Sequence, residues 1–273
     1  MTRRRVAVTG LGVVATCGIG NDAFWNGLCG PAPEGDRVVL DFDPTPHFGS
    51  PKEVRRSDRC TQFAIAAADM ALEQAGPLTA DPTRRGVLIG TGIGGIQTLE
   101  DQILVMHEKG ARGVSPFLVP MMMPNAAPAA VSMKHGFQGP AENTCTACAA
   151  GTHAIANAAR LIAHGRCDVV LAGGSEAPFV DAAIAGFTNM TAFSSAGISR
   201  PFDAERDGFV MGEGAGVLCL EDWETAEARG ATILAEVLGG ASTADAHHIT
   251  APSPGGKGAI TCIRHALEEA EVE

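Results

Sequence analysis

The stretch PAENTCTACAAGTHAIANAARLIAHGRCDVVLAGG, residues 140–174, places a turn, a helix and a strand in immediate succession. Ile155, Ala159 and Ile162 recur at the spacing of one helix face, which predicts an amphipathic helix after the turn. The apolar run at 167–173 has the length and the β-branched content of a buried strand. A helix that leads into a fully apolar strand is typical of α/β proteins.

The same alternation continues along the chain, where short β-branched runs are separated by alanine-rich stretches. We therefore expect an α/β fold with a mainly parallel sheet covered by helices on both faces. The expected strands are 5–11, 86–91, 167–173, 208–220 and 232–239. The expected helices are 60–75, 95–108, 125–134, 150–164, 222–229 and 256–271, and residues 31–58 are expected to form a surface loop.

Bulk composition excludes several classes of protein. With 45% hydrophobic and 19% charged residues, a chain of 273 residues can bury a substantial core. The net charge of −11 disfavours nucleic acid as a partner. Eight cysteines are too few for a disulfide scaffold, and Cys167 and Cys219 lie in apolar segments, which indicates buried thiols in a reducing compartment.

The N-terminal apolar run is too short for a secretory signal and is interrupted by Gly10 and Gly12. No later segment has the roughly 18 consecutive apolar residues that a membrane span requires. We expect a cytoplasmic protein with neither a membrane nor a nucleic-acid partner.

Two glycine motifs follow expected strands. VTGLGVVA carries G-x-G-x-x-A at 10–15, which resembles a dinucleotide fingerprint. The fingerprint needs an acidic residue about 20 positions further on at the end of a strand, but Asp36 lies in a Pro- and Gly-rich loop. A tight turn after the first strand is the favoured interpretation. GTGIGG at 90–95 lacks the Lys-Ser/Thr of a Walker loop, so packing or substrate approach is favoured over phosphate binding.

Cys145 and Cys148 are three residues apart and allow three interpretations. A zinc site requires a second pair of ligands, which the other cysteines do not supply, so we expect no metal. A redox pair is the second interpretation, although thioredoxin-like pairs usually occur near the N-terminus of a small domain. The third interpretation makes Cys148 a nucleophile and Cys145 a bystander.

The local setting of Cys148 favours the third interpretation. Cys148 lies where a strand turns into a helix, and the unpaired N–H groups at a helix start stabilise a thiolate and an oxyanion. The small residues around it let the turn pack tightly and let a substrate approach. Cys145 is expected to point into the core, and a structural role for Cys148 remains the alternative. His153, on the same helix, is expected to pack.

The motifs together resemble those of the elongating β-ketoacyl-acyl-carrier-protein synthases of bacterial fatty-acid and polyketide synthesis. The matching segments occur in the family's order and cover essentially the whole chain. They are VAVTGLGVVATCGIG, IGTGIGG, SPFLVPMMMPN, TACAAGTHAI, CDVVLAGGSEA, GISRPFDAERDGFVMGEGAGVLCLE and STADAHHITAPSPGG. The resemblance implies a thiolase-like α-β-α-β-α fold. It also implies a homodimer, or a heterodimer with a ketosynthase-like subunit.

The resemblance also implies a mechanism. Cys148 would take an acyl chain from acyl carrier protein as a thioester, and its N–H would form one arm of an oxyanion hole. The carbanion from decarboxylated malonyl-carrier would then attack that thioester and lengthen the chain. No cofactor is implied beyond the carrier's phosphopantetheine.

Further residues acquire expected roles from the same resemblance, and His248 is placed on a mobile loop at the substrate entrance rather than in catalysis. The implied substrate-binding residues are Ile93, Phe187, His248 and Thr250, and the implied carrier-docking residues are Arg55 and Arg56. The alternative for this arginine pair is an ordinary solvated charge run.

The resemblance divides the chain into a complete N-terminal half, 1–229, and the start of a second half, 230–273. The family's two catalytic histidines and lysine match no segment of these residues, so the chain is expected to be truncated and to be acylated without condensing by itself. The alternatives are a non-catalytic ketosynthase-like partner subunit, a thiolase-like acyltransferase and, last, a redox protein.

Overall fold

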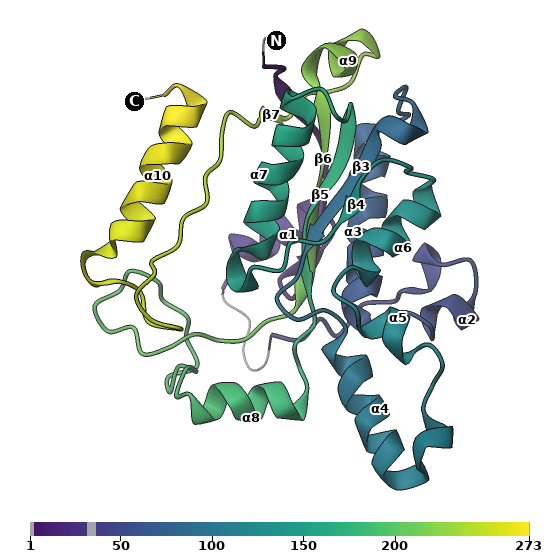
Figure 1. Ribbon diagram of the computed structural model, residues 1–273, viewed down its shortest axis with the longest axis vertical. Coiled ribbons are helices and arrows are strands. Elements are labelled where there is room, and N and C mark those ends of the chain that lie inside the picture. The colour runs from purple at the N-terminus through teal and green to yellow at the C-terminus, as the bar shows by residue number, and fades with distance from the viewer. Residues whose placement is uncertain (1–2, 32–36, 273) are drawn as a thin grey trace.

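The computed structural model describes residues 3–31 and 37–272, and Figure 1 shows one sheet at its centre with helices around it. The expected surface loop at 31–58 therefore lies partly outside the described residues, as does Asp36. The strands are β1 Val6–Ala15, β2 Gly18–Ile19, β3 Arg85–Gly90, β4 Ala141–Glu142, β5 Val169–Glu176, β6 Gly214–Asp222 and β7 Ala235–Glu236.

Helices connect and cover the strands. The α-helices are α1 Asn21–Leu28, α2 Pro51–Val54, α3 Arg59–Ala75, α4 Ile96–Lys109, α5 Leu118–Met122, α6 Ala126–His135, α7 Ala150–Ala163, α8 Asp181–Asn189, α9 Trp223–Ala228 and α10 Lys257–Ala270. The 3₁₀ turns are η1 Thr45–His47, η2 Pro82–Arg84, η3 Ala111–Gly113, η4 Ala147–Ala149 and η5 Pro254–Gly256. All six helices expected from the sequence are present in the structure.

The sheet is mixed, so the expectation of a mainly parallel sheet was wrong. Its order is β2-β1-β6-β5-β3-β4, with β7 also paired to β1. β3 pairs in parallel with β4 and β5, whereas β6 is antiparallel to both β1 and β5. The reason is that the chain between β5 and β6, which includes α8, turns back at the carboxyl end of β5 and does not cross a face of the sheet (Figure 1). The carboxyl ends of β1, β3 and β5 consequently lie at the same edge.

β1 continues through Gly10 and Gly12, with a shift in its pairing with β6 between Val8 and Gly10, so the expectation of a turn at these glycines was also wrong. A side chain at Gly10 would lie 2.0 Å from the carbonyl oxygen of Ala71, and one at Gly12 would lie 2.1 Å from that of Ala67. Both carbonyls belong to α3. The glycines therefore allow α3 to pack directly on the backbone of β1.

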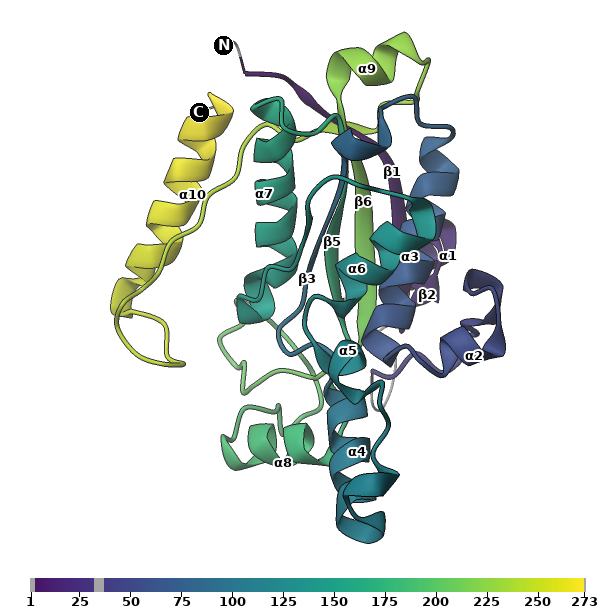
Figure 2. The ribbon, with the colours of Figure 1, turned by 45° about the vertical axis from the view of Figure 1, so that its right-hand side comes forward.

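Helices cover both faces of the sheet (Figure 2). α3 and α6 cover one face, where the fully buried Phe63 packs with Val87 and Val131. α7 covers the other face through Ala154, Ala158 and Ile162, a helix face that is fully buried. Cys167 and Cys219 are fully buried between these layers, as the sequence predicted, and burial raises the pKa of both thiols.

α10 lies outside α7, which separates it from the sheet in both Figure 1 and Figure 2. Glu269 of α10 accepts a hydrogen bond from the N–H of Gly240 at 2.9 Å. It also forms ion pairs with Arg160 of α7 at 3.3 Å and with Arg3 at 3.1 Å. The attachment of α10 to the rest of the described chain therefore includes a polar cluster around one carboxylate.

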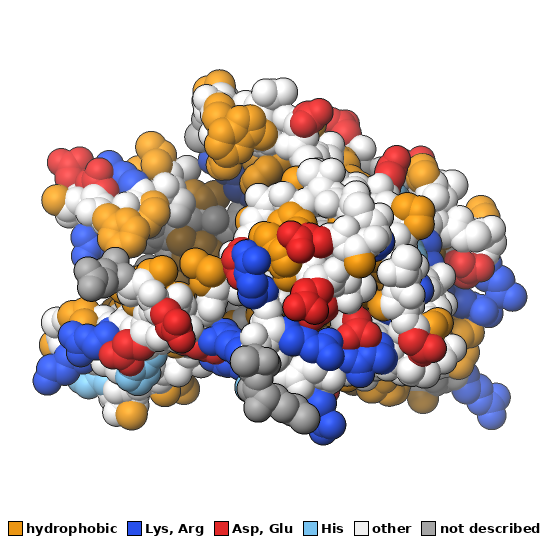
Figure 3. Space-filling model, turned by 90° about the horizontal axis from the view of Figure 1, so that it is seen from above, with side chains coloured by type: hydrophobic (Ala, Val, Ile, Leu, Met, Phe, Trp, Pro, Cys, Tyr) orange, Lys and Arg blue, Asp and Glu red, His pale blue; other side chains and the backbone are white. Residues whose placement is uncertain are grey.

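The end of the molecule with α9 and the N-terminal segment carries acidic and basic side chains next to one another (Figure 3). Arg4 lies 3.0 Å from Asp168 and 3.5 Å from Asp222, which fixes the entry to β1 beside β5 and β6. Arg5 pairs with Glu236 of β7 at 2.8 Å. Within residues 3–31 and 37–272, we find no helix with the length and apolarity needed to cross a membrane.

Candidate active site

Cys148 lies in η4, the 3₁₀ turn that leads directly into α7. The segment before it runs from β4, so the strand-to-helix turn expected from the sequence is present. Cys148 is exposed, and the preceding Ala147 has φ 50°, in the left-handed region. A helix start leaves its first N–H groups without helical partners, so this turn presents donors beside an accessible thiol.

Close backbone packing fixes the position of this turn. A side chain at Gly90, the last residue of β3, would lie 2.3 Å from the carbonyl oxygen of Ala150. One at Gly174 of β5 would lie 3.0 Å from the Cα of Gly151. The first turn of α7 thus rests directly on the ends of two strands. Because both contacts involve backbone, the site has little freedom to move.

Cys145 is exposed, so the expectation that it points into the core was wrong. The alternation of strand faces does not reach it, because β4 ends at Glu142 and the following segment is irregular. The Cys145 thiol donates instead to the carbonyl oxygen of Gly92 at 3.4 Å. This contact joins the segment before Cys148 to the turn that follows β3.

The turn at 91–94 is held by a carboxylate at the end of β5. Glu176 Oε2 accepts the N–H of Gly92 at 2.6 Å, and Oε1 accepts the hydroxyl of Thr91 at 2.9 Å. The Thr91 hydroxyl oxygen in turn accepts the N–H of Gly94 at 3.1 Å. Three residues of this turn, Thr91, Gly92 and Gly94, are therefore tied to Glu176 directly or through Thr91.

Sequence reasoning missed Glu176, although a signal was available. An acidic residue directly after AGGS ends a buried strand, and the carboxyl ends of strands are where sites form in α/β sheets. It also missed a contact of His153, whose Nδ1 lies 2.9 Å from the Thr146 hydroxyl across the turn that holds Cys148. His153 therefore does more than pack, because it bridges α7 to the residues before Cys148.

Ile93 and Phe187 come from different elements. Ile93 is 40% exposed and lies in the turn that contacts the Cys148 segment. Phe187, on α8, forms an aromatic cluster with Phe193 and Phe209 at ring distances of 5.8 and 5.4 Å. α8 lies at the same lower end of the molecule as the start of α7 in Figure 1.

His248 and Thr250 lie on an exposed loop before α10. His248 Nδ1 accepts the N–H of Thr250 at 3.2 Å and that of Ala251 at 3.0 Å. Because Nδ1 accepts these two bonds, its lone pair points toward the backbone of the loop and is not available to a ligand. Only Nε2 remains to face a ligand.

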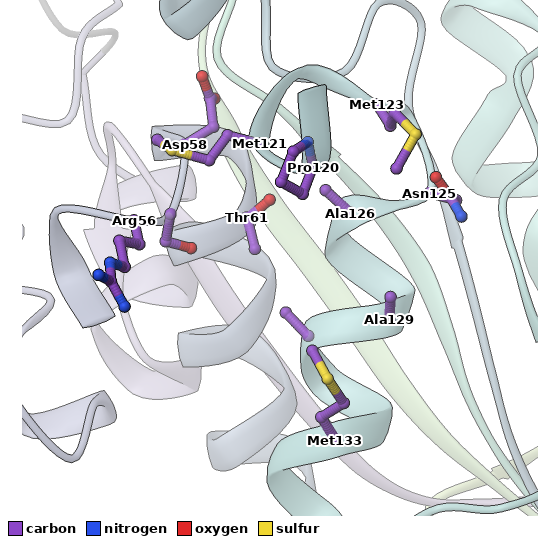
Figure 4. Close-up of a pocket in the computed structure, with 12 residues that line it drawn as sticks. Arg56, Asp58, Thr61, Pro120, Met121, Met123, Asn125, Ala126, Ala129 and Met133 are labelled. Carbon is purple, nitrogen blue, oxygen red and sulfur yellow. The ribbon is translucent and has the colours of Figure 1, made fainter. Parts of the chain in front are cut away.

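Arg55 and Arg56 are exposed at the end of α2. The Arg56 guanidinium stacks over the ring of Phe117 at 3.9 Å, which limits its freedom. Arg56 also borders a pocket of about 220 Å³ between α3, α5 and α6 (Figure 4). Three methionines line it, Met121, Met123 and Met133. Arg56 therefore lies beside a pocket that flexible methionine side chains line.

Among the described residues, no group of His, Cys, Asp and Glu has the arrangement needed to hold a metal ion.

Comparison with known proteins agrees with this arrangement. The family model described as "Beta-ketoacyl synthase, N-terminal domain" matches residues 34–226. The chain belongs to the β-ketoacyl synthase family. It is 42% identical to 3-oxoacyl-[acyl-carrier-protein] synthase 2 of Rhizobium meliloti over 98% of its length and 71% of that protein. The protein of the same name from Synechocystis is 43% identical, over 98% of this chain and 70% of the relative.

Solved ketosynthases share the fold. The ishigamide ketosynthase/chain length factor superposes with a TM-score of 0.90 at 32% identity, covering 99% of this chain and 71% of that one. A ketosynthase solved with its type II polyketide acyl-carrier protein superposes with a TM-score of 0.87 at 33% identity, with the same coverage. The thiolase-like α/β fold expected for this β-ketoacyl synthase is confirmed.

Proposed function

We propose that this β-ketoacyl synthase elongates acyl chains in fatty-acid or polyketide synthesis, with Cys148 as its acyl acceptor. The observation that carries the proposal is the position of Cys148, an exposed thiol in a fixed turn at the start of α7. Relatives named 3-oxoacyl-[acyl-carrier-protein] synthase 2 support the reaction class.

The first half-reaction uses groups in the described chain. The Cys148 thiolate attacks the carbonyl carbon of a carrier-bound acyl thioester, and negative charge develops on the carbonyl oxygen. N–H groups at the helix start, with that of Cys148 as one donor, stabilise this charge. The bond to the carrier sulfur then breaks, the carrier leaves as a thiol after protonation, and the acyl group remains on Cys148.

The second half-reaction lengthens the chain. Malonyl-carrier loses carbon dioxide, and the resulting carbanion attacks the Cys148 thioester and frees the cysteine. The family resemblance assigns decarboxylation and stabilisation of the carbanion to two histidines and a supporting lysine. None of them corresponds to a residue among these 273.

Acyl carrier protein is the proposed partner. Arg55 and Arg56 supply positive charge on a chain whose net charge is −11, and carrier proteins are acidic. A related ketosynthase was solved in complex with its acyl-carrier protein, which supports this assignment. We further propose a cytoplasmic protein that acts as a dimer, either with itself or with a ketosynthase-like subunit. Ile93, Phe187, His248 and Thr250 are the proposed substrate contacts.

Intact-mass measurement after incubation with an acyl-pantetheine thioester tests the proposal. Wild-type protein is expected to gain the mass of one acyl group, and Cys148→Ser is expected to gain none under the same conditions. Cys145→Ser is the matched control, because this thiol is also exposed and lies three residues away. Loss of acylation in Cys145→Ser with retention in Cys148→Ser would overturn the assignment.

A further inference from the structure

Glu176 is a titratable group beside the nucleophile turn that the proposed reaction does not use. It is half-buried, and its carboxylate is occupied by Gly92 and Thr91 at 2.6 and 2.9 Å. A side chain at Gly92 would lie 2.9 Å from Glu176 Oε2 and 3.6 Å from the Cα of Ala147. The carboxylate and the residue before Cys148 therefore approach the same point of the 91–94 turn.

The 91–94 turn is tied to the Cys148 segment by two further bonds. The N–H of Thr91 donates to the carbonyl oxygen of Thr144 at 3.3 Å. The thiol of Cys145 donates to the carbonyl oxygen of Gly92 at 3.4 Å. A continuous set of hydrogen bonds thus runs from Glu176 through the turn to the residues that lead into Cys148.

We propose that Glu176 is a positioning residue for acyl transfer, whose carboxylate holds the 91–94 turn against the nucleophile turn and thereby fixes the Cys148 thiol. This inference rests on the proposed role of Cys148. An ionised carboxylate suits the task because both of its oxygens accept, so it can receive an N–H and an O–H at once. A protonated carboxyl or an amide keeps only one such acceptor oxygen free of hydrogens.

The surroundings of Glu176 change the pH at which it ionises. Burial raises the pKa of Glu176 above its ordinary value, the hydrogen bonds from the turn oppose that rise, and the charge of Asp58 adds to it. Cys60 also faces Glu176, from the start of α3, but burial raises its pKa to about 12, so it stays neutral. Cys145 and Cys148 are the titratable groups on the nucleophile segment.

The test measures alkylation of Cys148 by iodoacetamide, followed by peptide mass spectrometry, in wild type and Glu176→Gln. We expect Glu176→Gln to slow alkylation by roughly tenfold at alkaline pH, as the loss of one bond to a charged acceptor implies. Exposed Cys29 is an internal control whose rate should not change. Glu73→Gln, at an exposed glutamate of α3, is the matched control variant.

The pH dependence separates positioning from a merely structural role. Because Gln resembles the protonated carboxyl, the ratio of wild-type to Glu176→Gln rates should fall toward one as pH drops through the raised pKa of Glu176. A purely structural role would lower the melting temperature and leave this ratio near one at every pH. A ratio near one at alkaline pH, or a large ratio that does not change with pH, would overturn the proposal.

A second variant keeps the test decisive if Glu176→Gln does not fold. Thr91→Val removes the hydroxyl donor and leaves the carboxylate, so the pKa of Glu176 should rise further. The loss of Cys148 alkylation rate that accompanies protonation of Glu176 is then expected at a higher pH than in wild type. The same pH in both proteins would contradict the proposal. Acylation that persists in Cys148→Ser would instead refute the proposed function, whatever the Glu176 result.

Discussion

At the scale of single residues, Asp69 shows how one carboxylate can tie three segments together. His47 Nδ1 lies 2.6 Å from Asp69 Oδ2, His135 Nε2 lies 3.0 Å from Oδ1, and Lys134 pairs with the same group. Burial opposes ionisation, but the contacts with His135, Lys134 and His47 outweigh it and lower the pKa of Asp69 to about 2. The cluster fastens the loop before α2 to α3 and α6.

This low pKa predicts a pH-dependent contribution to stability. A carboxylate whose pKa is lower in the folded state than in the unfolded state stabilises the protein at every pH above the unfolded pKa. This stabilisation is lost as the pH falls through the folded-state pKa. Asp69→Asn is therefore expected to lower the free energy of unfolding by about 2 kcal/mol at neutral pH.

Urea denaturation of wild type and Asp69→Asn at several pH values checks this expectation. The difference should narrow as pH is lowered from about 4 toward 2. Asp41→Asn, at an exposed aspartate, is the control, and it should change the free energy of unfolding only slightly. A difference between wild type and Asp69→Asn that stayed constant over this range would contradict the linkage.

At the scale of elements, the position of Cys148 depends on how α7 meets the sheet. Gly90→Ala would place its Cβ 2.3 Å from the carbonyl oxygen of Ala150, so the first turn of α7 must shift. We expect a loss of about 2–3 kcal/mol in the free energy of unfolding, as for overpacked cores. Acylation of Cys148 should also become slower in the molecules that remain folded.

Gly186→Ala is the matched control for this change. Gly186 lies in α8, and nothing lies within 4 Å of the position that its Cβ would occupy. Alanine should therefore stabilise that helix by about 0.5–1 kcal/mol. Thermal melts of both variants and the acylation rate of each provide the comparison. Equal stability of the two variants would show that α7 adjusts without cost.

Elements that carry their own signal were predictable from the sequence. The expected helix 150–164 is observed as Ala150–Ala163, because alanine-rich amphipathic periodicity is a local property. The expected strand 208–220 begins only at Gly214, because the residues before it make isolated bridges, Phe193 to Phe209 and Arg37 to Gly212, and no continuous ladder. Strand direction was not predictable, since it depends on partners distant in sequence.

The same distinction applies to the candidate site. The position of Cys148 at a helix start was predicted from its neighbours in sequence, because a helix start is a local feature. The orientation of Cys145 was missed because it depends on Gly92, a residue 53 positions earlier. Glu176 was missed because its partners come from the turn after another strand, 84 and 85 positions away.

At the scale of the whole molecule, charge determines how an acidic protein can meet an acidic carrier. Arg55→Glu together with Arg56→Glu is expected to slow acylation from acyl-carrier protein by about tenfold at low salt, through lost electrostatic steering. Acylation from a free acyl-pantetheine thioester should be unchanged, because that substrate does not need the docking surface.

Stopped-flow or quenched acylation with both substrates provides the measurement. Arg112→Glu is the control, because Arg112 is also exposed but lies in η3. Higher salt should reduce the difference between wild type and the double variant. An equal loss with both substrates would place the arginines in folding or chemistry rather than docking.

The pairing of β1 also has a consequence in time. β1 is synthesised before the other described strands, yet its partners β6 and β7 begin at Gly214 and Ala235. During translation this apolar strand emerges long before either neighbour exists, and β2, which follows it directly, pairs only with Val14 and Ala15. Pairings of such long sequence separation make folding slow. β1 therefore cannot pair fully until β6 and β7 have been synthesised. During this long interval chaperones can bind the exposed strand.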